Sequence, residues 1–469
     1  METIPCPVAR QHEQAEPPAR FPGPSAPRAT GANVQPMDIQ AFRDLRTPAG
    51  QQALEAAARS DVTENALLAT ASRLREEYPA ELVSAALTQI RLRARARAKF
   101  GTDAAAMYFT QAGLEQSTRA SVAAHRARRF AAYLGASGNG AGPSLDVHRV
   151  LELGCGIGAD LIARARAGCQ GEGVELDPLT AEVARANVAA FGLEDLASVR
   201  VGDATGEDPR GYAALFADPG RRTARGRVFD PRSYEPPLDT VLAMARSVPA
   251  ACVKVAPGIP YEALWDAPGP EHGVPASAGG PLEAEWISVG GEVKEAALWL
   301  GGLAGDAARR ATLIPSGPGE VRTLTPEPGL GDPPVGDWGR FLYEPDGAVI
   351  RAHLVAEVAA RVGGRLADPR IAYITSDALE PTPFAAAYEI EDVLPFSVKR
   401  LRGELRRRGV GTLTIKKRGS AVDPERLRHD LGFGRRASGR AAGGGAAALT
   451  LVLTRVGRAP VALLTTPAR

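Results

Sequence analysis

The nine residues Val150–Gly158 read VLELGCGIG and join an apolar stretch to an amphipathic one. Their three glycines allow a tight turn and let the backbone approach a ligand closely. The helix predicted to follow has free backbone N–H groups in its first turn. A strand, a glycine loop and a helix in this order predict a binding site for a nucleotide-like ligand at the edge of a doubly wound sheet.

Strands and helices are predicted to alternate around this loop. Short apolar runs predict strands at residues 147–153, 171–176, 197–201, 213–217 and 250–255, and helical periodicity predicts helices at 160–167, 178–191 and 237–247. We expect residues 286–289 and 296–300 to add a closing antiparallel pair. Alternating strands and helices with short connections predict an α/β fold with a Rossmann-like, doubly wound sheet.

Composition and periodicity divide the whole chain into five segments. They are a disordered extension, a helical N-terminal domain, the domain around the glycine loop, a Pro/Gly-rich linker and a small α+β C-terminal domain, at residues 1–36, 37–135, 136–314, 315–339 and 340–469. In the last segment we expect helices at 348–362 and 397–408 and strands at 372–375, 388–394, 410–416 and 449–455. Met37 follows the extension directly, so translation can start at Met1 or at Met37.

Acidic residues stand at the ends of four predicted strands. Glu152 lies two residues before the first glycine, and Glu175, Asp203 and Asp218 end the next three strands. The carboxyl ends of parallel strands meet at one edge of a sheet, so these side chains are expected to converge on one crevice. There Glu152 suits the ammonium group of a methionine moiety, Glu175 can accept from ribose hydroxyls, and Asp203 can accept from an adenine amine.

Two ligand classes compete for the glycine loop. Gly154, Gly156 and Ala159 also satisfy the dinucleotide pattern G-x-G-x-x-A. S-adenosylmethionine (SAM) is favoured because Glu152 precedes the loop and because Gly158 lies one position earlier than the dinucleotide pattern requires. In addition, the loop has no adjacent basic residue to meet a pyrophosphate.

The run Asp218-Pro219-Gly220-Arg221-Arg222 follows the fourth strand, where an acceptor would lie. Asp218 and Pro219 are the candidate catalytic residues, because Asp218 can hold an amine for in-line attack on a methyl group. Arg221 and Arg222 can bind phosphate or stack on a base, or they can pair with local acids. Lys254 is charged within an otherwise apolar strand, so it must either emerge at the same crevice or pair there, and we expect it to shape the substrate side as a substrate-binding residue.

The motifs LELGCGIG, GVELDP, VGDA and FADP resemble motifs I to IV of class I SAM-dependent methyltransferases, over roughly residues 145–310. The resemblance implies that Glu152 and the three glycines hold the methionine end of SAM. It also implies that Glu175 binds the ribose and that Asp203 binds the adenine.

The element after the fourth strand departs from a related pattern. Many methyltransferases that act on nucleobase amines have Asp/Asn-Pro-Pro-aromatic there, and this chain keeps only the first two residues. A stacking aromatic would then come from elsewhere, such as Phe229, Tyr234 or Tyr261.

Over most of residues 85–469 the chain resembles a bacterial family of uncharacterised class I methyltransferases with a C-terminal THUMP-like domain. The runs that carry this resemblance are MYFT at 107–110, GLEQST at 113–118, AHRAR at 124–128, DPGRR at 218–222, KVAPG at 254–258, EPDGAVIRA at 344–352, AYITS at 372–376 and IKKRG at 415–419. The core is also similar to RNA cap guanine-N2 methyltransferases, without their proline–aromatic element. THUMP domains bind RNA, so the resemblance implies an RNA substrate.

Positive charge is concentrated near the C-terminus. Residues 399–440 contain fourteen Lys and Arg against four Asp and Glu. Such an excess fits a surface that follows a phosphate backbone, and a solvated arginine-rich face is the alternative. Few aromatic residues are interleaved, which favours recognition of backbone or shape over reading of single bases.

Other features bound the function classes. The four cysteines and six histidines are scattered without metal-ligand spacing, which predicts no metal site and a reducing, cytoplasmic setting. No apolar run reaches the roughly 20 residues of a membrane-spanning helix. The net charge of +2 identifies no partner by itself.

Together these features predict a methyltransferase that uses SAM to methylate a base nitrogen of RNA. One alternative is a methyltransferase acting on a protein or a small molecule. Another is an RNA-binding protein that retains SAM without turnover. An NAD-linked oxidoreductase is disfavoured by the glycine spacing and by the lack of a clear acid/base histidine.

Overall fold

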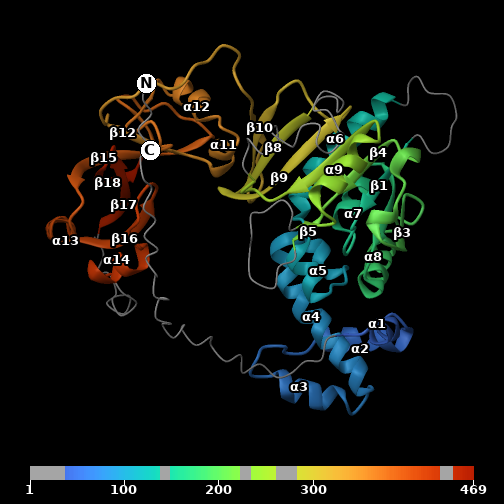
Figure 1. The fold of residues 1–469 in the computed structure, drawn as a ribbon. Helices are drawn as coiled ribbons and strands as arrows, with labels where there is room; N and C mark the ends of the chain where they lie inside the picture. Colours follow the sequence, from blue (N-terminus) through green and yellow to red (C-terminus); the bar gives the residue numbers. More distant parts are fainter. Residues whose placement is uncertain (1–36, 138–147, 222–233, 260–281, 434–446, 469) are drawn as a thin grey trace, which may run out of the picture. The chain divides into compact units, whose positions relative to one another are not determined.

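The fold is taken from a computed structural model, which describes residues 37–137, 148–221, 234–259, 282–433 and 447–468 (Figure 1). The predicted extension at residues 1–36 lies outside these ranges. The described N-terminal region is helical, as predicted. Its α-helices are α1 (Ile39–Leu45), α2 (Pro48–Ala58), α3 (Leu67–Leu74), α4 (Ala80–Phe100), α5 (Gln111–Gln116) and α6 (Ala120–Ser137). Asp38 and Thr47 cap α1 and α2 by accepting backbone N–H bonds.

The larger sheet contains nine strands within the described residues, in the order β11-β10-β8-β9-β7-β4-β1-β2-β3. Their bounds are β1 (Arg149–Leu153), β2 (Gln170–Glu175), β3 (Ala197–Val201), β4 (Ala214–Ala217), β7 (Ala250–Val255), β8 (Leu282–Val289), β9 (Glu292–Gly301), β10 (Arg309–Ile314) and β11 (Arg322–Leu324). Among the described residues, the α-helices between these strands in sequence are α7 (Ala159–Arg166), α8 (Pro178–Ala190) and α9 (Leu238–Arg246).

Strand β1 is the switch point of this sheet. The chain runs from β1 to β2 and β3 on one side, and then to β4 and β7 on the other, with all these neighbours parallel. Strand β9 is antiparallel to both β7 and β8, which confirms the predicted closing pair. Both strands of the pair are longer than the predicted runs at 286–289 and 296–300. The Rossmann-like, doubly wound α/β sheet is therefore confirmed.

Both faces of the central strands are buried. In β4, Leu215 and Ala217 pack in the cluster that contains α9, whereas Ala214 and Phe216 pack in the cluster that contains Phe130 of α6. Successive side chains of a strand point to opposite faces, so α6 and α9 cover different faces of the sheet. This alternation decides which charged residues share the α6 face.

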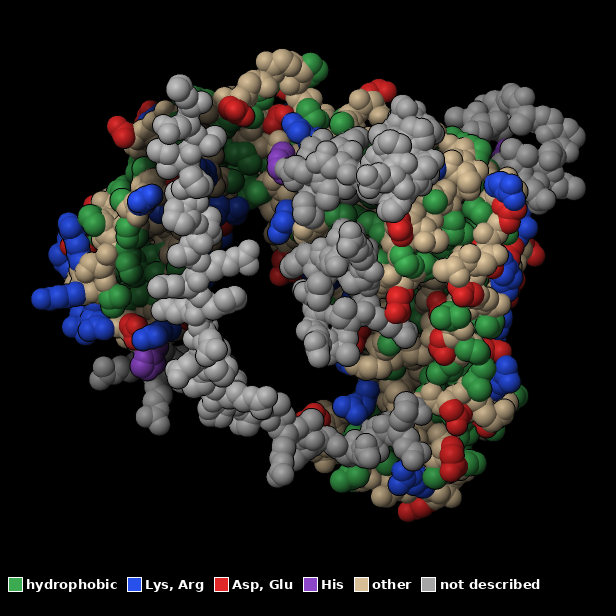
Figure 2. Space-filling view, in the orientation of Figure 1, with side chains coloured by type: hydrophobic (Ala, Val, Ile, Leu, Met, Phe, Trp, Pro, Cys, Tyr) green, Lys and Arg blue, Asp and Glu red, His purple; other side chains and the backbone are tan. Residues whose placement is uncertain are grey.

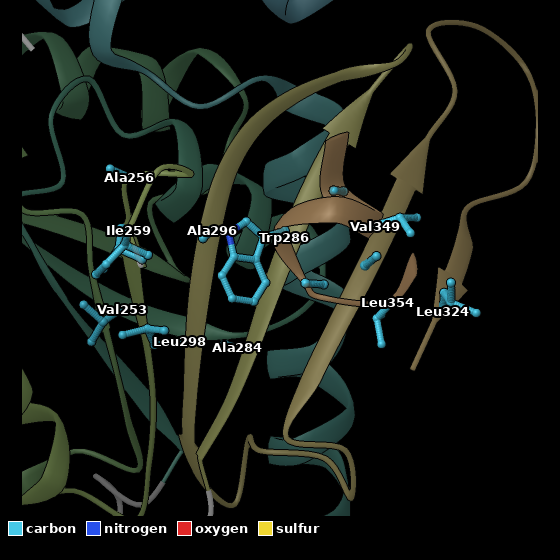
Figure 3. Close-up of a cluster of buried hydrophobic side chains, with 14 of the residues drawn as sticks. Val253, Ala256, Ile259, Ala284, Trp286, Ala296, Leu298, Leu324, Val349 and Leu354 are labelled. Atoms are coloured by element: carbon cyan, nitrogen blue, oxygen red, sulfur yellow. The ribbon is translucent and has the colours of Figure 1, made fainter. Parts of the chain in front are cut away.

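The segment predicted as a linker, residues 315–339, needs a correction. It contains β11, which pairs with β10, and Leu324 of β11 belongs to the main hydrophobic core. Figure 3 shows that this core continues from Trp286 to Val349 and Leu354 in the region that follows. Proline and glycine content alone therefore did not separate a linker from a strand that completes a sheet.

The second sheet has the order β13-β14-β12-β15-β18-β17-β16. Its strands are β12 (Phe341–Pro345), β13 (Arg365–Leu366), β14 (Ile374–Ser376), β15 (Ala385–Pro395), β16 (Val410–Lys417), β17 (Ala447–Val456) and β18 (Ala459–Pro467), and its helices are α11 (Gly347–Arg351), α12 (Val355–Arg361), α13 (Val398–Arg407) and α14 (Pro424–Asp430). The small α+β C-terminal region is confirmed. The predicted helix 348–362 is divided into α11 and α12 at His353, whose φ is 55°.

Candidate active site

The glycine loop adopts a conformation that favours glycine. Gly154, Gly156 and Gly158 have φ values of 71°, 54° and 83°, in the left-handed region. The N–H groups of Gly154 and Cys155 both donate to Val174 O, at 2.9 and 3.0 Å, so the loop is bound to the end of β2. Gly158 is the N-cap of α7. The loop therefore presents backbone without side chains at the carboxyl edge of β1.

Glu175 ends β2 beside this loop. Its carboxylate accepts from Gly156 N at 2.9 Å and from Asp177 N at 3.0 Å. Two apolar side chains next to this position are unusually accessible: Leu176 is 69% exposed, and Val201, the partner of Glu175 in β3, is 46% exposed. An acid beside accessible apolar side chains offers contacts both to hydroxyl groups and to a flat ring.

Asp203 has a local structural contact. Its carboxylate accepts from Thr205 N at 2.9 Å and from Thr205 Oγ1 at 2.8 Å, and so caps a short 3₁₀ turn at Ala204–Gly206. These bonds lower the pKa of the exposed Asp203 carboxyl. The side chain lies at the end of β3, as the sequence predicts, and its adenine contact stays a prediction.

Glu152 does not project from the edge of the sheet. It is buried on the α6 face and forms an ion pair with Arg164 of α7. Burial raises the pKa of Glu152 from its ordinary 4.5 to about 7, against the opposing effect of Arg164. The structure therefore places Glu152 beneath the glycine loop, paired to a cation of the protein.

This buried acid gives a testable pH dependence. Between about pH 4.5 and 7 the folded state holds a proton on Glu152 that the unfolded chain releases, so this group makes the free energy of unfolding fall as the pH rises. Urea unfolding at several pH values should show that Glu152→Gln is stabilised relative to the wild type as the pH rises through this window. Parallel pH profiles for the two proteins would contradict the assignment.

Asp218 and Lys254 lie together beside the glycine loop. Lys254 Nζ donates to Asp218 Oδ2 at 2.6 Å and to Thr118 Oγ1 at 3.1 Å. The Asp218 side chain remains 31% exposed, and its backbone carbonyl lies beside Gly154. The acid that follows β4 is thus held by a lysine from β7, directly next to the glycine loop.

The alternation of the strands explains why this face carries so many charges. Lys254 shares the face of Cys252, and Glu295 of β9 shares the face of Ala297 and Trp299. Glu295 Oε2 lies 3.9 Å from Lys254 Nζ, and its other oxygen pairs with Arg126 of α6. Arg126 Nη2 also pairs with Asp160 Oδ1 at 2.6 Å. A chain of alternating charges therefore runs from Asp160 of α7 through Arg126 of α6 to Asp218 beside the glycine loop.

Opposite charges compensate for burial in this network. Burial alone would lower the pKa of Arg126, but the neighbouring Asp160 raises it above its ordinary value. Arg126 and Lys254 likewise lower the pKa of the buried Asp160 carboxyl, against the effect of burial. Buried ions of this kind need their partners, because each would be strongly destabilising alone.

The N-terminal region closes over the glycine loop. Asn187 of α8 donates to the carbonyls of Tyr108 and Ile157 and accepts from Tyr108 N, at 2.7 to 3.0 Å. Gly113 of α5 packs so closely on Ile157 that a Cβ at position 113 would overlap that side chain. The segment before α6 is therefore part of the wall of the site.

The remaining predicted residues are placed as follows. Tyr234 is buried, and its hydroxyl accepts from Ala256 N at 2.8 Å, so it is a core residue and not an exposed stacking partner. Arg221 lies in the two-residue strand β5 (Gly220–Arg221), which pairs with β6 (Tyr234–Glu235). Arg222, Phe229 and Tyr261 lie outside the described residues.

Several residues of this site had no role assigned from the sequence: Thr118, Arg126, Asp160, Leu176 and Glu295. Thr118 and Arg126 occur in runs that carry the family resemblance, which was their only signal. Leu176 follows Glu175 directly, and an apolar residue at the end of a strand was a signal that the sequence did offer. Glu295 could be recognised as a site residue only from the register of β9 against β7, which the sequence pattern does not reveal.

The described residues contain neither a metal-binding cluster of side chains nor a membrane-spanning helix. These residues contain no group of three or more His, Cys, Asp or Glu side chains that could hold a metal ion. Within the same ranges, no helix is long and apolar enough to cross a membrane. Cys155, Cys169 and Cys252 are buried free thiols.

A doubly wound sheet, a glycine loop after its first strand and an acid at the end of each of the next three strands are typical of a SAM-dependent methyltransferase of class I. Comparison with known proteins gives the family. An uncharacterised SAM-dependent methyltransferase of Mycobacterium tuberculosis, found with the same values in strains CDC 1551 and H37Rv, is 34% identical over 373 residues, which cover 78% of this chain and 91% of that protein. The chain belongs to the SAM-dependent methyltransferase family, and SAM is its cofactor.

Two family models and one solved structure add to this. A domain of unknown function matches residues 38–96, and a THUMP domain-like model matches residues 385–467. The crystal structure of a candidate methyltransferase from Porphyromonas gingivalis W83 superposes with a TM-score of 0.63 at 22% identity. It covers 92% of this chain and 98% of that one, so the two share their fold over nearly their whole length.

Proposed function

We propose that this methyltransferase transfers a methyl group to a base nitrogen of RNA and that Asp218 holds the acceptor. The observation that carries the RNA proposal is a set of exposed cations on the THUMP-like region. The observation that carries the acceptor proposal is the Asp218–Lys254 pair beside the glycine loop.

The residues present fit SAM. The loop offers backbone at Gly154 and Gly156 without obstructing side chains, Glu175 offers a carboxylate for the ribose hydroxyls, and Leu176 and Val201 offer apolar contacts for the adenine. When bound, SAM supplies the methyl group. The residues of the protein fix its orientation and the orientation of the acceptor.

The chemistry of Asp218 favours a nitrogen acceptor. A base amine attacks with a neutral lone pair, so no proton has to leave before the C–N bond forms. The methylated cation is then strongly acidic, and a nearby carboxylate can remove its proton. A hydroxyl acceptor would need a stronger base before the attack. Asp218 Oδ2 is bound to Lys254, which leaves Oδ1 without a hydrogen bond from any described residue.

The basic run of the C-terminal region is only partly available to a polyanion. Arg408 pairs with Glu391 and Asp392, Lys416 pairs with Glu344, and Arg428 donates to a backbone carbonyl. Exposed cations whose side chains form no hydrogen bond or ion pair within 4 Å with another described residue remain on α13 and α14: Lys399, Arg400, Arg406 and Arg426. Figure 2 shows Lys and Arg side chains gathered over α13. A cluster of this kind, in a THUMP-like region, supports RNA as the substrate.

The proposal is tested with labelled SAM, purified protein and total RNA from a strain lacking the gene, with total protein as a parallel acceptor. Label in RNA that digests to a base-methylated nucleoside is the expected result. Label in protein alone would favour the protein methyltransferase alternative. Measurable SAM binding without label in RNA, protein or small molecules would favour a protein that binds SAM without turnover.

A binding prediction follows from the position of Glu175. Glu175→Ala removes the carboxylate proposed for the ribose hydroxyls and the acceptor of Gly156 N, so we expect SAM to bind at least about 10-fold more weakly, since hydrogen bonds to charged groups contribute roughly 1.5–3 kcal/mol. Isothermal titration calorimetry measures this change. Glu194→Ala, at an exposed acid on the turn after α8, is the matched control and should bind as the wild type does.

A further inference from the structure

We propose that the helical N-terminal region supplies a positioning residue for the methyl transfer: the Thr118 hydroxyl holds the Lys254 ammonium group, which in turn holds the Asp218 carboxylate. The inference rests on the proposed role of Asp218. It concerns a residue 100 positions away in sequence that touches neither reacting group.

The contacts form one short chain. Thr118 is buried, two residues before α6, and Lys254 Nζ donates to its Oγ1 at 3.1 Å and to Asp218 Oδ2 at 2.6 Å. Glu295 Oε2 is farther from Nζ, at 3.9 Å. An ammonium group has three N–H donors, so two of them are engaged by Thr118 and Asp218 at hydrogen-bonding distance. Thr118 therefore fixes the direction from which Lys254 reaches Asp218.

The hydroxyl serves two cations at once. Arg126 Nη2 also donates to Thr118 Oγ1, at 3.1 Å. A hydroxyl oxygen has two acceptor lone pairs, so Thr118 satisfies one donor from each cation and keeps the two positive groups in defined places. A residue of the same shape without the oxygen would leave the buried Arg126 donor and the largely buried Lys254 donor each short of one acceptor.

The segment that carries Thr118 is fixed by contacts of its neighbouring residues. Lys99 of α4 donates from Nζ to three carbonyls, those of Leu114, Glu115 and Ser117, at 2.7 to 2.9 Å. Gly113 of α5, five residues before Thr118, packs on Ile157 of the glycine loop. The turn that carries Thr118 is thus fixed to the loop proposed to hold SAM. The segment around Thr118 therefore helps to position both the acceptor and SAM.

Transfer between two bound groups depends strongly on this kind of alignment, and a displacement of about 1 Å can cost about 10²-fold. We therefore expect Thr118→Val to lower kcat by roughly 10- to 100-fold with little change in the KM for SAM. Thr118→Ser keeps the oxygen and should restore most of kcat. Thr323→Val, at an exposed position in β11, is the control for an isosteric change and should leave kcat unchanged.

A second measurement needs no acceptor. The full-length protein is treated with a limiting amine-reactive acylating reagent, and modification of Lys254 is followed by peptide mass spectrometry, with Lys416 as the internal reference. Lys254 should react faster in Thr118→Val than in the wild type, and Thr118→Ser should behave as the wild type does. Urea unfolding verifies that each variant is folded at the assay temperature.

The outcomes separate the two proposals. Loss of kcat in Thr118→Val with rescue by Ser, together with faster modification of Lys254, supports the positioning role. An unchanged kcat, or equal modification rates in wild type and Thr118→Val, overturns it. If the wild type labels no RNA, the proposed function fails, and the modification rates alone still decide whether Thr118 positions Lys254.

Discussion

Asp218→Asn should lower the rate of methyl transfer by about 10²- to 10⁴-fold, which is the range typical of a positioned proton acceptor. Asn keeps the shape of the side chain but presents a weaker acceptor to the amine and cannot take its proton. It also leaves Lys254 without the carboxylate 2.6 Å away. The affinity for SAM should stay within about threefold of the wild type, because the proposed SAM contacts lie on β1, β2 and β3.

Single-turnover rates with labelled SAM measure the first quantity, and calorimetric titration measures the second. Asp208→Asn is the matched control, because Asp208 is an exposed acid that pairs only with its neighbour Arg210 among the described residues. Full activity in Asp218→Asn would show that the acceptor is held by another group. Loss of SAM binding in this variant would move Asp218 from the acceptor side to the cofactor side.

Arg126→Leu should destabilise the fold by about 3–5 kcal/mol, the cost expected when one partner of a buried ion pair is removed. Arg126 is 1% exposed, and its loss leaves Asp160 and Glu295 without their main cation. The Leu side chain fills part of the space but compensates neither charge. Because Arg126 also donates to Thr118, activity should fall at temperatures where the variant is still folded.

The shift in the urea midpoint gives the change in stability. Arg128→Leu removes an exposed arginine two positions away on the same helix and should stay within about 0.5 kcal/mol of the wild type. A loss below about 1 kcal/mol in Arg126→Leu would indicate that water reaches Asp160 and Glu295 and takes over the role of the guanidinium group.

The central elements could be predicted because local signals agreed there. Strands β3 and β7 have the predicted bounds, since each is a short apolar run that ends in turn residues. Strands β12 and β18 were missed, although both are largely buried. Each ends in a proline, which weakens the signal of a strand in the sequence. The division of helix 348–362 at His353 depends on a backbone conformation that the sequence pattern does not reveal.

In the candidate site, residues at strand ends could be predicted from the sequence, whereas buried orientations and long-range contacts could not. Glu175 is the last residue of β2, and Asp203 and Asp218 follow the ends of β3 and β4, so all three lie at the edge of the sheet where the pattern predicted them. Glu152 is inside β1 and shares the face of Val150, and strand alternation turns it into the protein. Thr118 reaches Lys254 across 136 positions of sequence, a contact that only the tertiary fold creates.

The close packing of Gly113 on Ile157 and the contacts of Asn187 with Tyr108 limit where this chain can be truncated, fused or recombined. A fusion or truncation made at residue 136 would remove the wall over the glycine loop and the threonine beneath the lysine. A cut at residue 340 would separate Trp286 from Val349 and Leu354 and divide one apolar core. Recombination between relatives should therefore succeed only when residues 107–384 all come from the same parent protein. This block is longer than the segment that carries the methyltransferase motifs.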